Sequence, residues 1–321
     1  MIKVLAIDGG GIRGLVPAMV LEEIERRTRR PTAASFDLIA GASTGALLAL
    51  GLTRPGPEGA PAFTASALRR LYEERGAEIF DRSSWRWLGT LGGLTDERYP
   101  AGPLERVLRE YFGEARLREA LAPVLVPAYA IELRSAFFFR SHRARRDPSH
   151  DFPMWEVARA ATAAPTYFEP AELADAATAT YYALIDGGVF ANNPALAAYV
   201  EARTLFPKRE RILVVSLGTG RRTRPLRYRD VRNWGLARWA PAILDVIFDG
   251  VSDTVDYELT HLLPTREPHR RYYRFQIDLR NASDALDDAT PQNLRALAAE
   301  ARALIAAQGT ALDRLCAKLR A

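Results

Sequence analysis

Short apolar runs that end directly in glycine-rich turns are the feature that most limits how this chain can fold. Val4–Ile7 leads into an acidic residue and a glycine cluster, Phe36–Ala40 leads into a turn of small residues, and Ile212–Leu217 ends in Gly-Thr-Gly. Their length and flanking glycines predict buried strands. Helical patterns follow the first two runs, over Gly14–Arg27 and Thr44–Leu52. Strands that alternate with helices predict a layered α/β fold with a mostly parallel sheet.

The 321 residues are compatible with two domains or with one, because a domain averages roughly 150 residues but α/β folds often use about twice that length as a single unit. No internal repeat indicates a solenoid. The C-terminal part is mainly helical by pattern, with helices over Leu236–Leu263 and from about Gln292, and a strand at Tyr272–Ile277 between them.

The composition is that of a folded globular protein, with 48% hydrophobic and 26% charged residues, which excludes an intrinsically disordered chain. A lone cysteine, Cys316, excludes an internal disulfide framework and a cysteine-rich metal site. No signal peptide is visible before the first strand, and the longest apolar stretch, Leu38–Leu52, is shorter than the ~20 residues of a membrane span. We therefore expect a cytoplasmic protein. The net charge of +5 is too small for a chain of this length to predict binding to a nucleic acid polymer.

Gly41-Ala-Ser-Thr-Gly45 is a G-x-S-x-G sequence between a predicted strand and a predicted helix. A serine on such a sharp turn adopts a strained backbone conformation, and the flanking Gly41 and Gly45 give the chain room. The Ser43 hydroxyl then points out of the sheet at a helix N-terminus, where developing negative charge is favoured. The alternative is a tight turn of small residues, but the strand–turn–helix context favours Ser43 as a nucleophile.

Asp8-Gly-Gly-Gly-Ile-Arg-Gly14 follows the first strand and contains a G-x-G-x-x-G pattern. A dinucleotide site would require an acidic residue at the end of the second strand, and that strand ends in Ala40-Gly41. We therefore favour a hole for an oxyanion, formed by backbone N–H groups of Gly9, Gly10 and Gly11. Arg13 would add positive charge beside it, or else pair with a surface carboxylate.

An activated serine needs a base, and Asp186-Gly187-Gly188 follows a predicted strand, where α/β sheets place site residues. A D-G-G sequence is also an ordinary turn. His261 and His269 come after Asp186, so a Ser…Asp…His triad is available in chain order, although neither histidine lies in a motif. Sequence reasoning leaves a dyad and a triad open and favours the dyad.

DGGGIRG at 8–14, GASTG at 41–45 and DGGVFANNPA at 186–195, in this order, resemble the patatin family of lipid acyl hydrolases. The segments ARAATAAPTYFEP at 158–170 and ILVVSLGTG at 212–220 agree with it. The similarity runs from about Lys3 to the C-terminal helix, so it implies one patatin-like domain over residues 1–321, with the helical C-terminal part packed on it. It also implies a three-layer α/β/α fold.

The resemblance implies an esterase, lysophospholipase or phospholipase A that uses a Ser–Asp dyad and neither a metal nor an organic cofactor. Ser43 would be the nucleophile and Asp186 the base, with the Gly9–Gly11 backbone and Arg13 as the oxyanion hole. The supporting motif glycines would be Gly14, Gly41, Gly45, Gly187 and Gly188. The substrate would be a phospholipid or another acyl-ester lipid. An acyltransferase is the alternative with the same chemistry, and a non-enzymatic binding module is the alternative of a different class.

The start of the chain is similar to bacterial cytosolic members, some of which are activated by cyclic oligonucleotides in antiphage defence. A cyclic-nucleotide activator is therefore a further expectation.

Two segments are candidates for contact with lipid. Arg221–Trp239 combines many arginines with Tyr228, Trp234 and Trp239, and arginine suits lipid phosphates while tryptophan favours the bilayer interface. Trp85–Leu88 lies in a glycine-rich stretch typical of a mobile lid. The alternative is that these aromatic residues pack on the core. We expect peripheral association with the inner face of the membrane, and an acyl pocket lined by Tyr167 and Phe168.

Overall fold

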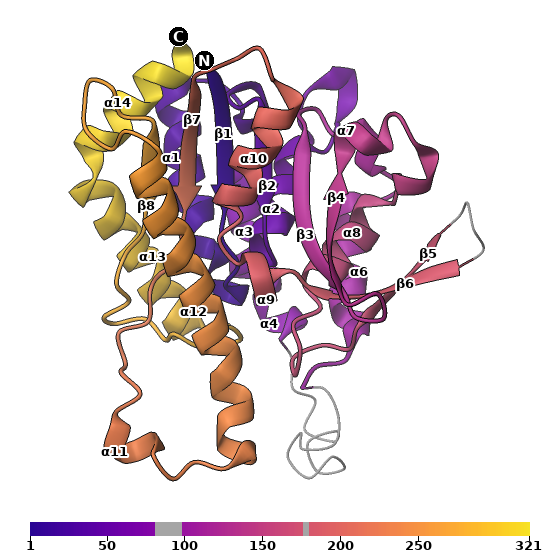
Figure 1. Cartoon of the computed structure of the whole chain (residues 1–321), viewed down its shortest axis with the longest axis vertical. Coiled ribbons are helices and arrows are strands. Elements are labelled where there is room, and N and C mark those ends of the chain that lie inside the picture. Colours follow the sequence, from indigo (N-terminus) through magenta and orange to yellow (C-terminus); the bar gives the residue numbers. More distant parts are fainter. Residues whose placement is uncertain (81–97, 176–179) are drawn as a thin grey trace.

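A central sheet lies between two layers of helices in the computed structural model, which describes residues 1–80, 98–175 and 180–321 (Figure 1). The lid candidate Trp85–Leu88 lies outside the described residues. The strands are β1 (Ile2–Ile7), β2 (Leu38–Gly41), β3 (Val124–Ala130), β4 (Ser135–Arg140), β5 (Ala171–Asp175), β6 (Thr180–Asp186), β7 (Ile212–Leu217) and β8 (Tyr272–Phe275). The layered α/β/α class expected from the sequence is confirmed.

The sheet order within the described part of the chain is β5-β6-β3-β2-β1-β7-β8, and β4 also pairs with β3. The strands β3, β2, β1, β7 and β8 are parallel to one another. The three remaining strands, β4, β5 and β6, pair antiparallel. The sheet is therefore parallel at its centre and antiparallel on one side, beside β3.

The α-helices of the described residues are α1 (Leu15–Thr28), α2 (Thr44–Thr53), α3 (Ala65–Arg70), α4 (Gly76–Ile79), α6 (Ala101–Phe112), α7 (Ser141–Ala144), α8 (Met154–Ala161), α9 (Gly188–Ala191), α10 (Ala195–Leu205), α11 (Tyr228–Val231), α12 (Leu236–Leu262), α13 (Pro291–Ala307) and α14 (Gly309–Arg320). A 3-10 turn, Gly11–Gly14, leads into α1.

Alternate residues of β1 enter two different cores, because successive side chains of a strand point to opposite faces of the sheet. Leu5 and Ile7 join the larger core, which also takes residues from α1, α2, α8, α13 and α14. Val4 and Ala6 join the smaller core, which α10 and α12 cover. Both faces of β1 are therefore buried, which explains why its sequence is a continuous apolar run rather than an alternating one.

The C-terminal segment differs from its expected single helix. It forms two helices, α13 and α14, and Gln308 between them has φ −105° and ψ 21°. Gly309, the next residue, has a low helix propensity. The break turns α14 back so that Leu312, Leu315 and Leu319 are buried in the larger core together with residues of α1.

This shared core leads us to propose that residues 1–321 fold as one cooperative unit. Leu315 is fully buried, so Leu315→Ala should lower the free energy of unfolding by about 2–5 kcal/mol. Urea denaturation followed by circular dichroism and by hydrogen exchange of the β1 amides should give coincident shifts. Leu133→Ala, at a position that is 65% exposed, is the matched control and should change stability by less than ~0.5 kcal/mol. A shift in α14 alone would contradict the single unit.

Candidate active site

Ser43 lies on a strained turn between β2 and α2, with φ 51° and ψ −123°. The turn is tight on both sides of the serine. A Cβ atom on Gly41 would lie 2.0 Å from the Gly45 carbonyl oxygen, and a Cβ on Gly45 would lie 2.2 Å from the Ile7 carbonyl oxygen. Only glycine fits at these two positions. The G-x-S-x-G sequence therefore has the strand–turn–helix geometry that a nucleophilic serine requires.

Asp186 is the last residue of β6 and is fully buried. Its Oδ1 accepts a hydrogen bond of 2.7 Å from the Gly188 N–H, while no donor within the described residues meets hydrogen-bond geometry at Oδ2. Burial raises the pKa of this carboxyl to about 7, and the opposing effects of the Ser43 hydroxyl and the Gly188 N–H are smaller. The Ser43 hydroxyl therefore lies close enough to lower the pKa of this carboxyl, although the two groups do not meet the geometry of a hydrogen bond.

Asp186 reaches this site by a route that the sequence argument did not foresee. β6 runs antiparallel to β3, so its end need not lie at the edge where the parallel strands end. It arrives there because the pairing of β6 with β3 joins Leu184–Asp186 to the last residues of β3, with Asp186 opposite Ala128. Gly187 is required at the following turn, since a Cβ there would lie 2.4 Å from the backbone of Pro127.

The histidines have other positions. His142 contacts Glu201 at 2.9 Å, His150 lies 3.5 Å from Asp147, His261 is exposed and bonded to the Tyr257 carbonyl, and His269 is exposed. The interactions that set the pKa of Asp186 include no histidine. This geometry favours a dyad over the triad that the chain order left open.

The glycine-rich loop after β1 presents only part of its backbone to Ser43. The Gly9 N–H donates to the Asn192 carbonyl at 3.0 Å, and the Ile12 N–H donates to the Leu286 carbonyl at 2.8 Å. Among the described residues, no acceptor is found for the N–H groups of Gly10 and Gly11. Three glycines are expected to form an oxyanion hole. The N–H groups of Gly10 and Gly11 are therefore available as donors, whereas the N–H of Gly9 is already hydrogen-bonded.

Arg13 supports this loop from behind. Its guanidinium is buried and donates to the Gly10 carbonyl at 3.3 Å and to the Gly220 carbonyl at 3.2 Å. Burial, reinforced by Arg222, lowers the pKa of Arg13 to about 10. The side chain lines a polar pocket, whereas Ser43 lines an apolar one. The alternative of pairing with a surface carboxylate is not seen, because the ion pairs of the described residues do not include Arg13.

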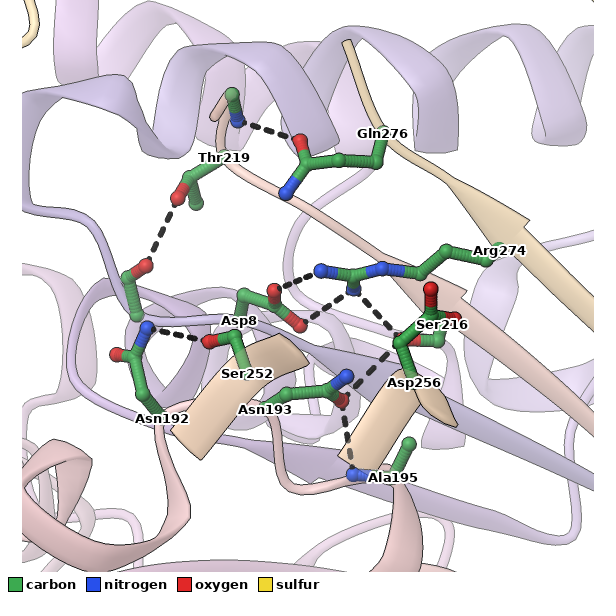
Figure 2. Close-up of polar contacts among 12 residues, drawn as sticks. Asp8, Asn192, Asn193, Ala195, Ser216, Thr219, Ser252, Asp256, Arg274 and Gln276 are labelled. Carbon is green, nitrogen blue, oxygen red and sulfur yellow. Dashed lines mark hydrogen bonds and ion pairs between the residues drawn. The ribbon is translucent and has the colours of Figure 1, made fainter. Parts of the chain in front are cut away.

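A buried polar network that sequence reasoning missed holds the base of the loop (Figure 2). Arg274 binds both carboxylate oxygens of Asp8, at 2.8 and 2.6 Å, and also Ser216 Oγ at 2.7 Å. The Thr219 hydroxyl donates to the Gly9 carbonyl at 2.8 Å. These contacts link β1, β7 and β8 directly behind the glycines, and no local motif marks Arg274 as a participant.

An apolar cavity begins at Ser43. Most of its wall is apolar, and the side chains that line it include Leu47, Leu71, Tyr72, Ile79, Phe80, Leu104, Ala164, Tyr167, Phe168, Phe248 and Leu286. The expected pocket residues Tyr167 and Phe168 are among them. An apolar lining of this kind suits an acyl chain. No group of three or more metal-ligating side chains occurs in the described parts of the chain.

Two substitutions separate backbone strain at position 43 from loss of the hydroxyl. Alanine keeps the Cβ that this φ and ψ disfavour, whereas glycine does not. In urea denaturation, we expect the free energy of unfolding of Ser43→Gly to be about 1 kcal/mol higher than that of Ser43→Ala. The same pair at Ser66, in the helical backbone of α3, should show the opposite order. Equal stability of the two Ser43 variants would contradict the strain.

Comparison with known proteins agrees with this geometry. The family model described as "Patatin-like phospholipase" matches residues 5–199. Patatin-like protein 2 of Arabidopsis thaliana is 33% identical over 93% of this chain and 81% of its own length. Patatin-like protein 1 of Oryza sativa subsp. indica is 33% identical over 92% and 79%, and Patatin-04/09 of Solanum tuberosum is 30% identical over 92% and 82%. These relatives are plant proteins, so a bacterial cytosolic type stays a prediction. The chain belongs to the patatin-like phospholipase family of lipid acyl hydrolases.

Proposed function

We propose that this protein hydrolyses carboxylic esters of glycerolipids, as a phospholipase A, lysophospholipase or esterase, through a Ser43–Asp186 dyad. The observation that carries the proposal is the strained Ser43 next to a buried carboxyl with a pKa of about 7, at the mouth of an apolar cavity. A carboxylate with an ordinary pKa is a weak base for a serine hydroxyl. Asp186 is a stronger base because it is buried and has no cationic partner among the described residues.

In the first half of the reaction, Asp186 accepts the Ser43 proton while Ser43 Oγ attacks the ester carbonyl. The negative charge that forms on the carbonyl oxygen is stabilised by the free N–H groups of Gly10 and Gly11. The intermediate then expels the alcohol part of the lipid, which leaves with the proton from Asp186. Ser43 remains as an acyl ester, with its acyl chain in the apolar cavity.

In the second half, water attacks the acyl-enzyme and Asp186 again accepts a proton. The Ser43–acyl bond breaks, the proton returns to Ser43, and the fatty acid leaves. If an alcohol or thiol replaced water in this step, the protein would be an acyltransferase. Product analysis by mass spectrometry in the presence of glycerol distinguishes the two. Activation by a cyclic nucleotide stays a prediction from the resemblance, tested by adding a nucleotide panel to the same assay.

The dyad predicts a definite dependence on pH. Asp186 acts as a base only when it is deprotonated, so kcat/KM for a soluble aryl ester should rise about tenfold per pH unit below about 7 and level off above it. Ser43→Ala should abolish acyl-enzyme formation, and Asp186→Asn should lower turnover by roughly 10³–10⁴.

His261→Ala and His269→Ala are the controls for this experiment and should retain most activity. A folded histidine variant that is as inactive as Ser43→Ala would overturn the dyad in favour of a triad. A rate that stays flat from pH 5 to 8 would show that Asp186 is not the base.

We also propose that the segment from Arg221 to Val246 docks on anionic membrane lipid, as a cytoplasmic protein would at the inner membrane face. The segment carries α11 and the start of α12 and extends well beyond the sheet (Figure 1). Its exposed large apolar side chains include Leu226, Tyr228, Ile243 and Val246. Among the described residues, no helix has the length and apolar character needed to cross a bilayer, so binding would be peripheral.

Some arginines of this segment are paired with acidic residues and others are exposed. Arg221 pairs with Asp278 and Arg222 with Asp245, each at 2.7 Å. Arg224, Arg227 and Arg232 are exposed, and the ion pairs found in the described residues do not include them. These three are therefore available for lipid phosphates.

Changing Arg224, Arg227 and Arg232 together to serine should weaken binding to anionic vesicles by roughly 150-fold, since each basic residue near such a surface contributes about 1 kcal/mol. Co-sedimentation at two salt concentrations measures this effect, and salt should weaken wild-type binding. The triple variant of the exposed Arg203, Arg209 and Arg211 changes the charge equally at the opposite end of the molecule and should bind like wild type. Binding that is insensitive to salt and to the first triple variant would rule out this surface.

A further inference from the structure

Two buried acceptor oxygens near Ser43 have no hydrogen-bond donor in the described residues: Asp186 Oδ2 and Asn192 Oδ1. Asn192 is 6% exposed. Unpaired buried polar atoms are rare in folded proteins because burying them is costly, so each requires an explanation. The role of Asp186 as a base accounts for the first oxygen. Nothing in the dyad accounts for the second.

The orientation of the Asn192 amide is fixed by its nitrogen. Asn192 Nδ2 donates to Ser252 Oγ at 3.0 Å and to the Phe248 carbonyl at 3.4 Å (Figure 2). The Ser252 hydroxyl donates to the Phe248 carbonyl at 2.8 Å, so it accepts from Asn192. The amide nitrogen therefore faces α12, and Oδ1 faces away from it. Anchoring to α12 makes no use of Oδ1.

Asn192 Oδ1 instead lies beside both members of the dyad. A Cβ atom on Gly9 would lie 2.2 Å from this oxygen and 3.0 Å from Ser43 Cβ. A Cβ on Gly188 would lie 3.1 Å from the same oxygen and 3.1 Å from Asp186 Oδ1. The absence of a side chain at these two glycines thus lets the amide oxygen approach the backbone next to the serine and the carboxyl.

We propose that Asn192 is a third catalytic residue, which acts in deacylation by holding the attacking water. Asn192 Oδ1 and Asp186 Oδ2 accept the two hydrogens of this water, which directs a lone pair of its oxygen at the acyl carbon. The proposal rests on the proposed acyl-enzyme and deepens it, because it assigns a residue to the second half of the reaction only.

The water oxygen bonds to the acyl carbon while one water proton passes to Asp186, and the other hydrogen stays on the new hydroxyl, bonded to Asn192 Oδ1. The carbon–Oγ bond then breaks, Ser43 Oγ takes the proton from Asp186, and the carboxylic acid leaves. Asn192 remains neutral throughout. A single acceptor would leave the water free to rotate, whereas two acceptors fix its orientation.

The experiment follows acylation and deacylation separately with a chromogenic aryl ester. Asn192→Leu keeps most of the side-chain volume but has no oxygen acceptor. It should retain the initial burst of about one product per active site, while the steady-state rate that follows falls about 10–100-fold. Intact-protein mass spectrometry should then detect accumulated acyl-enzyme. Hydroxylamine, a nucleophile that does not depend on this orientation, should restore turnover.

Ser252→Ala separates anchoring from catalysis, because it removes an acceptor of Asn192 Nδ2 and leaves Oδ1 in place. It should lower the steady-state rate much less than Asn192→Leu does. Asn281→Ala, at an exposed asparagine, is the matched control for loss of an amide.

A burst and a steady-state rate that fall together in Asn192→Leu would overturn the role in deacylation, and so would a Ser252→Ala variant with the same defect. Failure of the proposed function is recognisable separately, because wild-type protein would then form no acyl adduct at all.

Discussion

The turn after β1 packs against the turn after β2 at distances that leave no room for a methyl group between them. A Cβ on Gly45 would lie 2.2 Å from the Ile7 carbonyl oxygen, and a Cβ on Gly14 would lie 2.4 Å from Thr44 Oγ1. This contact requires glycine on both turns and brings the backbone of the first turn to the serine of the second. The strain at Ser43 persists because the parallel pairing of β1 with β2 holds both turns in place.

Two buried aspartates near this contact differ in their charged partners. Asp8 is bound through both oxygens by Arg274, so it has a counter-ion and acts as a structural anchor for the glycine-rich loop. Within the described residues, no cation contributes to the pKa of Asp186, and burial raises this pKa to about 7. One carboxyl therefore stabilises the loop, while the other is available to exchange a proton near neutral pH. Different environments give the same side chain different roles.

The parts that sequence could predict are those encoded by local pattern. Buried strands followed by glycine turns predict β1, β2 and β7, and the G-x-S-x-G sequence predicts the geometry at Ser43. Its place after a predicted strand and the family resemblance both indicate Asp186 as the base, but neither reveals that β6 is antiparallel and reaches the site through its register with β3. Strand direction depends on contacts that are distant in sequence, which no local pattern reports.

Other features could not be predicted because residue type does not encode them. The Gly9 N–H is occupied by a backbone carbonyl, that of Asn192, and any residue type could supply such an acceptor. Arg274 meets Asp8 from the far end of the chain, in a sequence that contains many other arginines. The Asn192 side chain lies in the recognised DGGVFANNPA segment, but which end of its amide faces the serine depends on α12.

Labelling with a serine-directed phosphonate, followed by peptide mapping by mass spectrometry, tests most directly whether Ser43 is the nucleophile. We expect one covalent adduct, on Ser43, formed faster as the pH rises through about 7 as Asp186 loses its proton. The adduct should be absent from Ser43→Ala. No adduct on folded wild-type protein, or an adduct on a different residue, would contradict the central claim.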